Sequence, residues 1–248
     1  MRRPTVAYEY DDQAHAEAER HALSDEEIAE LRTQVQAKRT TLGPEGVRGH
    51  RVPYNPMRWA GLIPAPLTKT TCISRGSVFD LAATGELTAV FTASYLWGSG
   101  KTGYGPHRLR RIIDSNNGHL SELLAMATSA AGKDVIAGYT KLYGGENYKT
   151  RAKPNTEPWT RIDGFGPAFF TKFLYFTTPG ALILDRVLAR KVHSLCEMKH
   201  LVDSRGRSLP WTPYRYSVYL HWMRQTAKAI GCTADELELT LFDPPRLP

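Results

Sequence analysis

Apolar residues recur at helical spacing along most of the chain, and cap-forming residues mark where helices begin and end. Ser24 and Glu27 have the spacing of a capping box. Ile28, Leu31 and Val35 follow as one apolar stripe, which predicts a helix to about residue 40. The same reasoning predicts further helices at about 77–81, 86–97, 106–115, 119–131, 133–143, 167–177, 185–198 and 212–231, and a short one from 233. Neither sustained period-two alternation nor an internal repeat is present, so the predicted fold class is all-α.

Glycine and proline concentrate in residues 43–66, which favours a loop or linker there. We therefore expect residues 1–50 to form an acidic N-terminal helical arm with its linker. Residues 51–248 are expected to form the main body. The segment 144–158 is polar and predicts a second loop.

Composition excludes several classes of protein. With 248 residues, of which 42% are hydrophobic, the chain can bury a sizeable core, which excludes a disordered protein. No run approaches 18 apolar residues, so no membrane span is expected, and MRRPTVAYEYDD lacks the apolar segment of a secretory signal. Three widely spaced cysteines predict reduced thiols rather than disulfides or a zinc site. We expect no metal and no cofactor.

The net charge of +7 is unevenly distributed. Residues 1–47 carry 6 basic and 10 acidic side chains, whereas residues 48–111 carry 9 basic and 2 acidic ones. A concentrated basic segment with interspersed aromatic residues suggests a polyanion surface, most simply nucleic acid. The alternative, a basic protein whose charge only keeps it soluble, is equally open at this stage.

The stretch GSGKT (98–102) resembles part of a phosphate-binding P-loop. That pattern needs glycine at the first of its eight positions, where this chain has Tyr95, and it needs a preceding strand, so we exclude an NTPase. What is left is a glycine-rich, basic turn in which Trp97 or Tyr104 could stack on a base. An ordinary interhelical loop with Trp97 in the core is the alternative.

The segment RIDGFGPAFFTKFLYF (161–176) predicts a tight turn before a helix that starts at a proline. Gly164 and Gly166, on either side of Phe165, permit positive φ and close approach of a ligand. Free amides at the helix N-terminus can then hold a phosphate of DNA without reading its sequence. A simple corner between two helices is the alternative.

Two ionisable residues in and after this segment are candidates for chemistry. Lys172 is a lone lysine on a helix that is apolar nearly all round, and burial favours its neutral, nucleophilic amine. Asp185 closes an apolar run before an amphipathic helix, which is the place of an N-cap aspartate. The alternatives are a solvated lysine and an aspartate that only caps.

The pair of segments IDGFGPAFFTKFLYF and ALILDRVLARKV resembles the helix-hairpin-helix DNA glycosylase superfamily. Within it the chain is most similar to bacterial 8-oxoguanine DNA glycosylase OGG-fold proteins, a group that includes phage-defence glycosylases. The stretch WGSGKTGYGPHRLRRI (97–112) supports this more loosely, and the resemblance does not extend to residues 1–50.

The resemblance implies two helical lobes with a hairpin near 161–177 and an active-site cleft between the lobes. It implies a catalytic role for Asp185 and a DNA-backbone role for Gly164, Phe165 and Gly166. The family lysine stands two residues after the second hairpin glycine, at Ala168 in this chain. Lys172 lies four residues further on, on the same helix face. The different position of the lysine affects the expected strand cleavage (the lyase step) more than the expected release of the base.

The implied function is a DNA glycosylase that flips and excises a modified base, with possible nicking of the strand at the abasic site. The substrate is expected to be a hypermodified phage base or 8-oxoguanine, in double-stranded DNA, and the protein a monomer in the bacterial cytosol. A non-catalytic hairpin DNA-binding protein is the alternative. The remaining candidates are Lys101, Arg108, Arg110 and Arg111 for phosphate contacts and Trp97, Tyr104, Phe169 and Phe170 for the base pocket.

Overall fold

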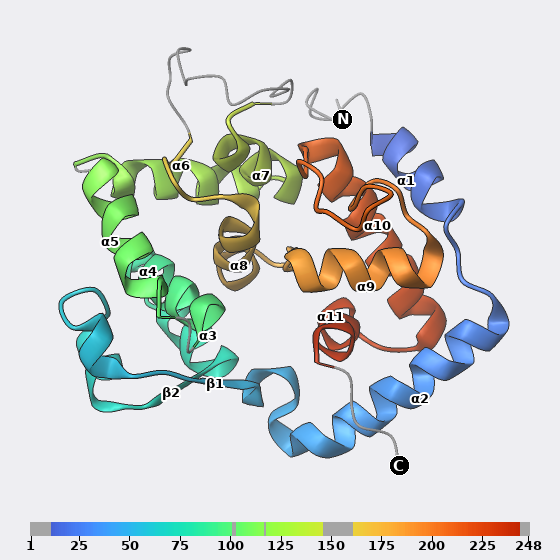
Figure 1. The fold of residues 1–248 in the computed structure, drawn as a ribbon, viewed down its shortest axis with the longest axis horizontal. Coiled ribbons are helices and arrows are strands. Elements are labelled where there is room, and N and C mark those ends of the chain that lie inside the picture. Colours follow the sequence, from blue (N-terminus) through green and yellow to red (C-terminus); the bar gives the residue numbers. More distant parts are fainter. Residues whose placement is uncertain (1–10, 101–102, 117, 146–160, 244–248) are drawn as a thin grey trace. The chain divides into compact units, whose positions relative to one another are not determined.

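The structure, a computed structural model, describes residues 11–100, 103–116, 118–145 and 161–243 (Figure 1). The helices are α1 (Asp11–Glu19), α2 (Asp25–Leu42), α3 (Arg75–Ala83), α4 (Leu87–Ser99), α5 (Gly105–Ser115), α6 (Leu120–Ala131), α7 (Val135–Tyr143), α8 (Pro167–Thr177), α9 (Arg186–Cys196), α10 (Pro213–Ile230) and α11 (Ala234–Phe242). The predicted all-α class is confirmed. Among these described residues, no helix is both long and apolar enough to cross a membrane.

Several predicted helix ends are confirmed by their capping contacts. The Ser24 amide donates to the Glu27 carboxylate at 2.8 Å, while the Glu27 amide donates to the Ser24 hydroxyl at 3.3 Å. Thr233 and Glu236 form the same reciprocal pair at the start of α11. The helix predicted at about 77–81 was expected to begin with Ser77 as its cap, which is wrong, because Ser74 caps α3 and its Oγ accepts from the Ser77 amide at 3.0 Å. Both serines are good caps, so sequence alone did not separate them.

The glycine- and proline-rich region contains more structure than the predicted loop. Three 3₁₀ segments occupy Gly43–Gly49, Pro56–Trp59 and Ala65–Lys69. Strands β1 (Arg51–Pro53) and β2 (Cys72–Ser74) pair antiparallel, with Val52 opposite Ile73. Strands of three residues are too short to produce a detectable alternation in the sequence.

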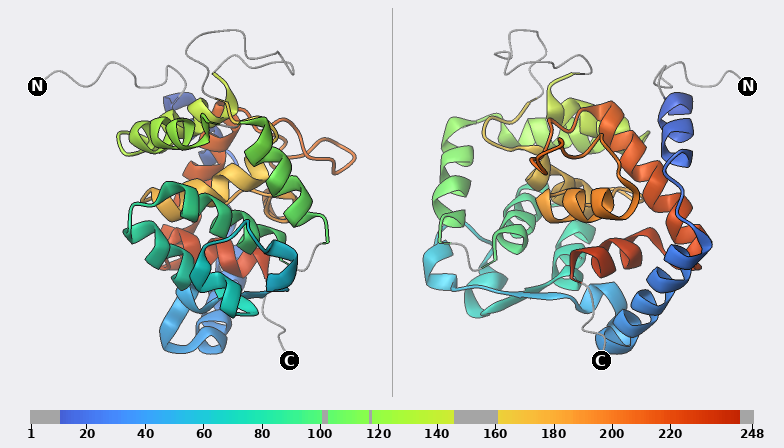
Figure 2. Two further views of the ribbon diagram at one scale, coloured as in Figure 1. Left: turned by 90° about the vertical axis from the view of Figure 1, so that its left-hand side faces the viewer. Right: turned by 45° about the vertical axis from the view of Figure 1, so that its right-hand side comes forward.

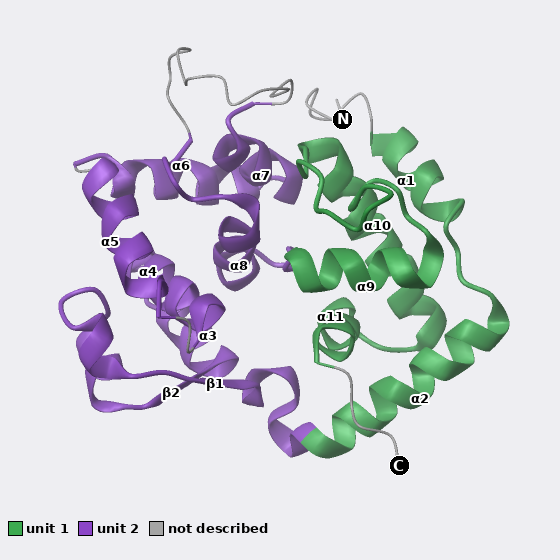
Figure 3. Cartoon of the chain, in the orientation of Figure 1, with its two compact units in different colours: residues 1–41, 184–248 green, residues 42–183 purple. Residues whose placement is uncertain are grey.

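The chain divides into two compact units (Figure 3). Unit 1 comprises residues 1–41 and 184–248, and unit 2 comprises residues 42–183. This differs from the predicted division into an arm of residues 1–50 and a body of residues 51–248. Helices α1 and α2 belong with the C-terminal helices, and contacts between the two ends of a chain leave no signal in local composition.

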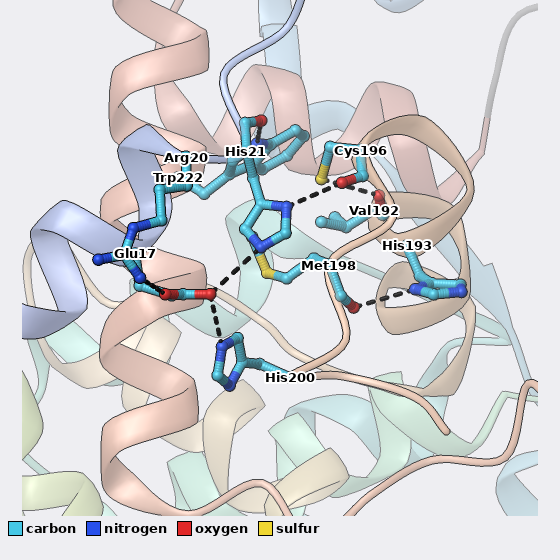
Figure 4. Close-up of polar contacts among 9 residues, drawn as sticks. All are labelled: Glu17, Arg20, His21, Val192, His193, Cys196, Met198, His200 and Trp222. Carbon is cyan, nitrogen blue, oxygen red and sulfur yellow. Dashed lines mark hydrogen bonds and ion pairs between the residues drawn. The ribbon is translucent and has the colours of Figure 1, made fainter. Parts of the chain in front are cut away.

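Helix α1 packs along α10 within unit 1, and polar contacts fix its C-terminal end (Figure 4). The Glu17 carboxylate bonds to Nε2 of His200 at 2.9 Å and accepts from Arg20 at 2.7 Å. The hydrogen bond with His200 lowers the pKa of Glu17, although partial burial acts in the opposite direction. His21 bonds to the Cys196 carbonyl through Nδ1 at 2.9 Å, and its own carbonyl accepts from the Trp222 indole at 2.9 Å.

Unit 2 is built around α8, which packs against α3, α4, α6 and α7 (Figure 2). Its core is rich in aromatic rings. Phe165 lies 4.9 Å from Phe91, and Phe170 lies 4.9 Å from Tyr139, measured between ring centroids. Edge-to-face pairs of this kind stabilise a core beyond the burial of their area.

Glu236→Gln is expected to make the stability of unit 1 less dependent on acid pH. Arg39 donates to this carboxylate at 2.7 Å and is the main reason that the Glu236 pKa is lowered from 4.5 to about 2. A lowered pKa contributes stability above the unfolded value of 4.5, and that contribution is lost as pH falls towards about 2. Because the pair is partly exposed, the variant should lose on the order of 1 kcal/mol at neutral pH, as urea denaturation would measure.

The difference between wild type and Glu236→Gln should shrink once the pH falls below the unfolded value. Glutamine can keep the capping contact, so the comparison isolates the charge. Glu122→Gln, at a side chain that is 71% exposed, is the matched control and should change little. A pH-independent difference for Glu236→Gln would contradict this explanation.

Candidate functional site

The hairpin predicted before α8 is a tight turn at residues 162–166. The Phe165 amide donates to the Ile162 carbonyl at 3.2 Å, and Phe165 is buried. Gly164 has a φ of 76°, and a Cβ there would lie 3.1 Å from Cγ1 of Ile112, so glycine suits both the backbone and the packing. No described residue accepts a hydrogen bond from the amides of Gly166 or Ala168. These amides lie at the start of α8, where the helix dipole favours an anion.

Asn116, at the C-terminal end of α5, holds this turn in place and was not found from the sequence. It is 6% exposed, and its Nδ2 donates to the carbonyls of Ile112 at 2.7 Å and Asp163 at 3.1 Å. Its Oδ1 accepts from the Asp163 amide at 3.0 Å. One side-chain amide therefore ties the hairpin to α5. An asparagine just after a helix usually indicates only the end of that helix, so the sequence did not predict the hydrogen bonds between Asn116 and Asp163.

Asp185 is the N-cap of α9, as predicted. Its Oδ1 accepts from the amides of Val187 at 2.9 Å and Leu188 at 3.2 Å. The side chain is partly exposed. Two backbone donors therefore fix the orientation of the carboxylate, and the helix N-terminus stabilises negative charge at this position.

Lys172 is buried within unit 2, with 5% exposure, as its apolar neighbours predicted. Its Nζ donates to the Ala168 carbonyl one turn earlier at 2.7 Å and lies 5.7 Å from the centroid of the Phe169 ring. Phe169 in turn stacks on Tyr95, with centroids 4.1 Å apart and planes 15° from parallel. Burial raises the pKa of Tyr95, which keeps its phenol neutral, while the nearby Arg108 acts in the opposite direction.

Gly98 lies on α4 and makes room for Lys172, rather than belonging to a flexible turn. A Cβ at Gly98 would lie 2.5 Å from Cδ and 2.9 Å from Cε of Lys172. A glycine within an otherwise apolar helix is a recognisable sign of close packing, but it does not name the partner. The structure supplies that partner.

The four residues suggested for a base pocket fall into two groups. Trp97 and Phe170 are 4% and 1% exposed and belong to the core of unit 2, which favours the alternative that the sequence left open for Trp97. The guanidinium of the fully buried Arg75 lies 5.0 Å from the Trp97 ring and also donates to the Tyr175 hydroxyl at 3.0 Å. Phe169 is half-buried, whereas Tyr104 is 68% exposed.

Helix α5 presents the predicted phosphate contacts on its solvent-exposed face. Arg108, Arg110 and Arg111 are exposed, and none forms an ion pair with another described residue. The Arg108 guanidinium lies 5.6 Å from the Tyr104 ring centroid. Lys101 lies outside the described residues. Arg108 thus lies beside an exposed aromatic ring, and α5 carries all three arginines at exposed positions.

The candidate residues are distributed over both units. Lys172 lies with Gly98, Phe169 and Tyr95 in unit 2, whereas Asp185 lies at the start of α9 in unit 1. Within the described ranges, no group of three His, Cys, Asp or Glu side chains is placed to hold a metal ion.

Asn116→Ala should loosen the hairpin while leaving the rest of unit 2 folded. The change removes three hydrogen bonds and leaves buried backbone groups unsatisfied, which costs about 2–3 kcal/mol. We expect faster hydrogen exchange at the Asp163 and Phe165 amides and a lower urea midpoint. Ser115→Ala, at the exposed neighbouring position, is the control. Equal exchange in the two variants would show that Asn116 does not hold the turn.

The chain matches one family model, described as "Putative 8-oxoguanine DNA glycosylase OGG-like protein", over residues 45–242. Neither the curated proteins nor the solved structures gave a match. The matched range contains the hairpin, Lys172 and Asp185 and omits both α1 and α2. The chain therefore belongs to the OGG-like family of DNA glycosylases, as the segments around the hairpin and Asp185 predicted.

Proposed function

We propose that this protein binds duplex DNA, flips a modified nucleotide out of the stack and cleaves its N-glycosidic bond. The observation that carries the proposal is the Asp185 carboxylate, which two amides orient at the start of α9. The sequence resemblance to helix-hairpin-helix glycosylases supports a catalytic role for this residue, which follows Lys172 by thirteen positions. Flipping is needed because the anomeric carbon is inaccessible to an enzyme inside the duplex.

In the hydrolytic reaction the base departs with the electron pair of the N-glycosidic bond, and the sugar becomes positively charged. A fixed carboxylate close to that sugar stabilises the charge electrostatically. Water then bonds to the anomeric carbon, Asp185 takes a proton from that water, and the departing base receives a proton. Asp185 acts in this scheme without any cofactor.

Lys172 could add a second activity. Its neutral amine would attack the anomeric carbon as the base leaves, and opening of the sugar ring would give a Schiff base that permits strand cleavage. To do so, Nζ must leave its hydrogen bond to the Ala168 carbonyl. That carbonyl belongs to the residue where the family lysine is expected.

The DNA contacts follow from the exposed donors of unit 2. The amides of Gly166 and Ala168 would bind a backbone phosphate, and Arg108, Arg110 and Arg111 would bind others. These contacts carry no sequence information. Selection of the damaged or modified base then depends on the pocket, for which half-buried Phe169 and exposed Tyr104 are the better-placed aromatic residues.

Asp185→Asn should lose at least about 100-fold in base release while remaining folded, because asparagine also caps helices well. The measurement is alkali-induced breakage of duplexes that contain 8-oxoguanine and of DNA from phages with hypermodified bases. Breaks in one substrate identify the base. The control is Asp12→Asn, at an exposed position of α1. Full activity of Asp185→Asn would remove Asp185 from the mechanism, and no breaks in either DNA would favour the non-catalytic binding protein.

Lys172→Gln should abolish covalent trapping on DNA by borohydride while leaving hydrolytic base release largely intact. Borohydride reduces a Schiff base to a stable amine, so trapping reports the lysine step specifically. Lys133→Gln, at an exposed position, is the control and should trap as wild type does. An undiminished adduct in Lys172→Gln would assign the nucleophile to another residue.

A further inference from the structure

Helices α9 and α11 pack side by side in unit 1 (Figure 1). Residues of both helices line a groove of about 490 Å³. One wall is α9, with Arg186, Val187, Arg190, Lys191 and Ser194. The other is the end of α11, residues 241–242. We call this feature the α9–α11 groove.

The α9–α11 groove is strongly basic. None of its three cations, Arg186, Arg190 and Lys191, forms an ion pair with a described residue, and no acidic residue lines it. Arg190 donates through Nε to the Gly206 carbonyl, which leaves its charge uncompensated. The nearby Asp243 is paired with Lys38 at 2.7 Å.

The groove also has an apolar surface. Val187 is 49% exposed, one of only three large apolar side chains this exposed among the described residues, and Leu241 lies opposite on α11. Cations beside an apolar floor suit a chain that alternates anionic and less polar groups, as a DNA strand alternates phosphates and sugars. A lone inorganic anion would not need the floor.

The helical spacing gives the groove a direction. Arg186 and Arg190 are four residues apart and share a helix face, and Lys191 and Ser194 continue along it. Asp185 directly precedes this row, and Arg190 lies only about 7.5 Å further along the helix axis. A strand carries one phosphate per roughly 3.4 Å of duplex axis. A strand whose sugar reaches Asp185 therefore has neighbouring phosphates within reach of the row.

We propose that the α9–α11 groove binds the phosphodiester backbone of DNA beside the nucleotide that Asp185 acts on. The inference rests on the proposed function and adds to it a DNA-binding surface on unit 1, separate from the hairpin and α5. Its contribution is electrostatic, so it governs affinity and salt dependence rather than sequence choice.

The test measures binding of the full-length protein to an unmodified, fluorescently labelled duplex at several salt concentrations. Arg186→Gln with Lys191→Gln should weaken binding and lower the slope of log affinity against log salt by about 1.8, since each lost phosphate contact contributes about 0.9. The matched control removes two exposed cations four residues apart on α10 of unit 1, neither of which lines the groove: Arg224→Gln with Lys228→Gln. It should leave the slope unchanged.

A gain-of-charge variant guards against loss of binding through misfolding. Ser194→Lys places a cation at the far end of the groove, on an exposed helical position, and should tighten binding and raise the slope by about 0.9. Gln13→Lys, at an exposed position of α1 in unit 1, adds the same charge at a position that does not line the groove and should do neither.

The outcomes separate this inference from the proposed function. If wild type binds the duplex but groove and control variants share one slope, the groove inference is overturned and the hairpin remains the DNA contact. Tighter binding of polyglutamate than of the duplex through Arg186 and Lys191 would assign the groove to an acidic protein and would also overturn it. If wild type binds no DNA, the proposed function fails, and the inference fails with it.

Discussion

The close approach of α4 to α8 at Gly98 is the constraint on which the geometry of unit 2 depends. Because Gly98 has no side chain, the carbons of Lys172 pack against α4, and the ammonium group is left at the Ala168 carbonyl. A buried amine needs such a hydrogen bond, since desolvation without one is costly. The same helix pair stacks Tyr95 on Phe169, so an aromatic surface lies directly beside the lysine. The position of Lys172 is thus set by packing around it as much as by its own place in the sequence.

Asp185 and the start of α8 depend on a second constraint, the amides that the first turn of a helix leaves without acceptors in its own backbone. At α9 those amides orient a carboxylate of the chain itself, whereas at α8 no described residue accepts from the amides of Gly166 or Ala168. Pro167 contributes to the second case, because it begins α8 without an amide of its own. The buried side chain of Asn116 fixes the turn in front of α8 through its hydrogen bonds. Two helices that follow one another along the chain therefore use their first-turn amides differently: α9 holds a carboxylate of the chain, and the proposed function assigns those of α8 to a DNA phosphate.

What the sequence predicted well was local. Capping at Ser24, Asp185 and Thr233 depends on residues within three positions of each other, and all three caps occur. What it could not predict depended on residues far apart in the chain. The burial of Arg75 against Trp97 and Tyr175, and the attachment of α2 to α11 through Arg39 and Glu236, connect segments with no shared pattern. The close packing at Gly98 lies between these cases, since the glycine is conspicuous but its partner is not.

The distribution of charge also differs between the sequence and the folded surface. Residues 48–111 carry 9 of the basic side chains and 2 acidic ones, so averaging along the chain identifies them at once. Residues 112–248 carry 17 basic and 13 acidic side chains, and their excess is unremarkable. Yet α9 concentrates Arg186, Arg190 and Lys191 in one groove, while acids such as Glu236 and Asp243 are taken up by ion pairs with α2. A polyanion is attracted by the unpaired charge on one face of the folded protein. Counting charges along the sequence misses this face, because the acidic residues that balance the count are paired with α2 after folding.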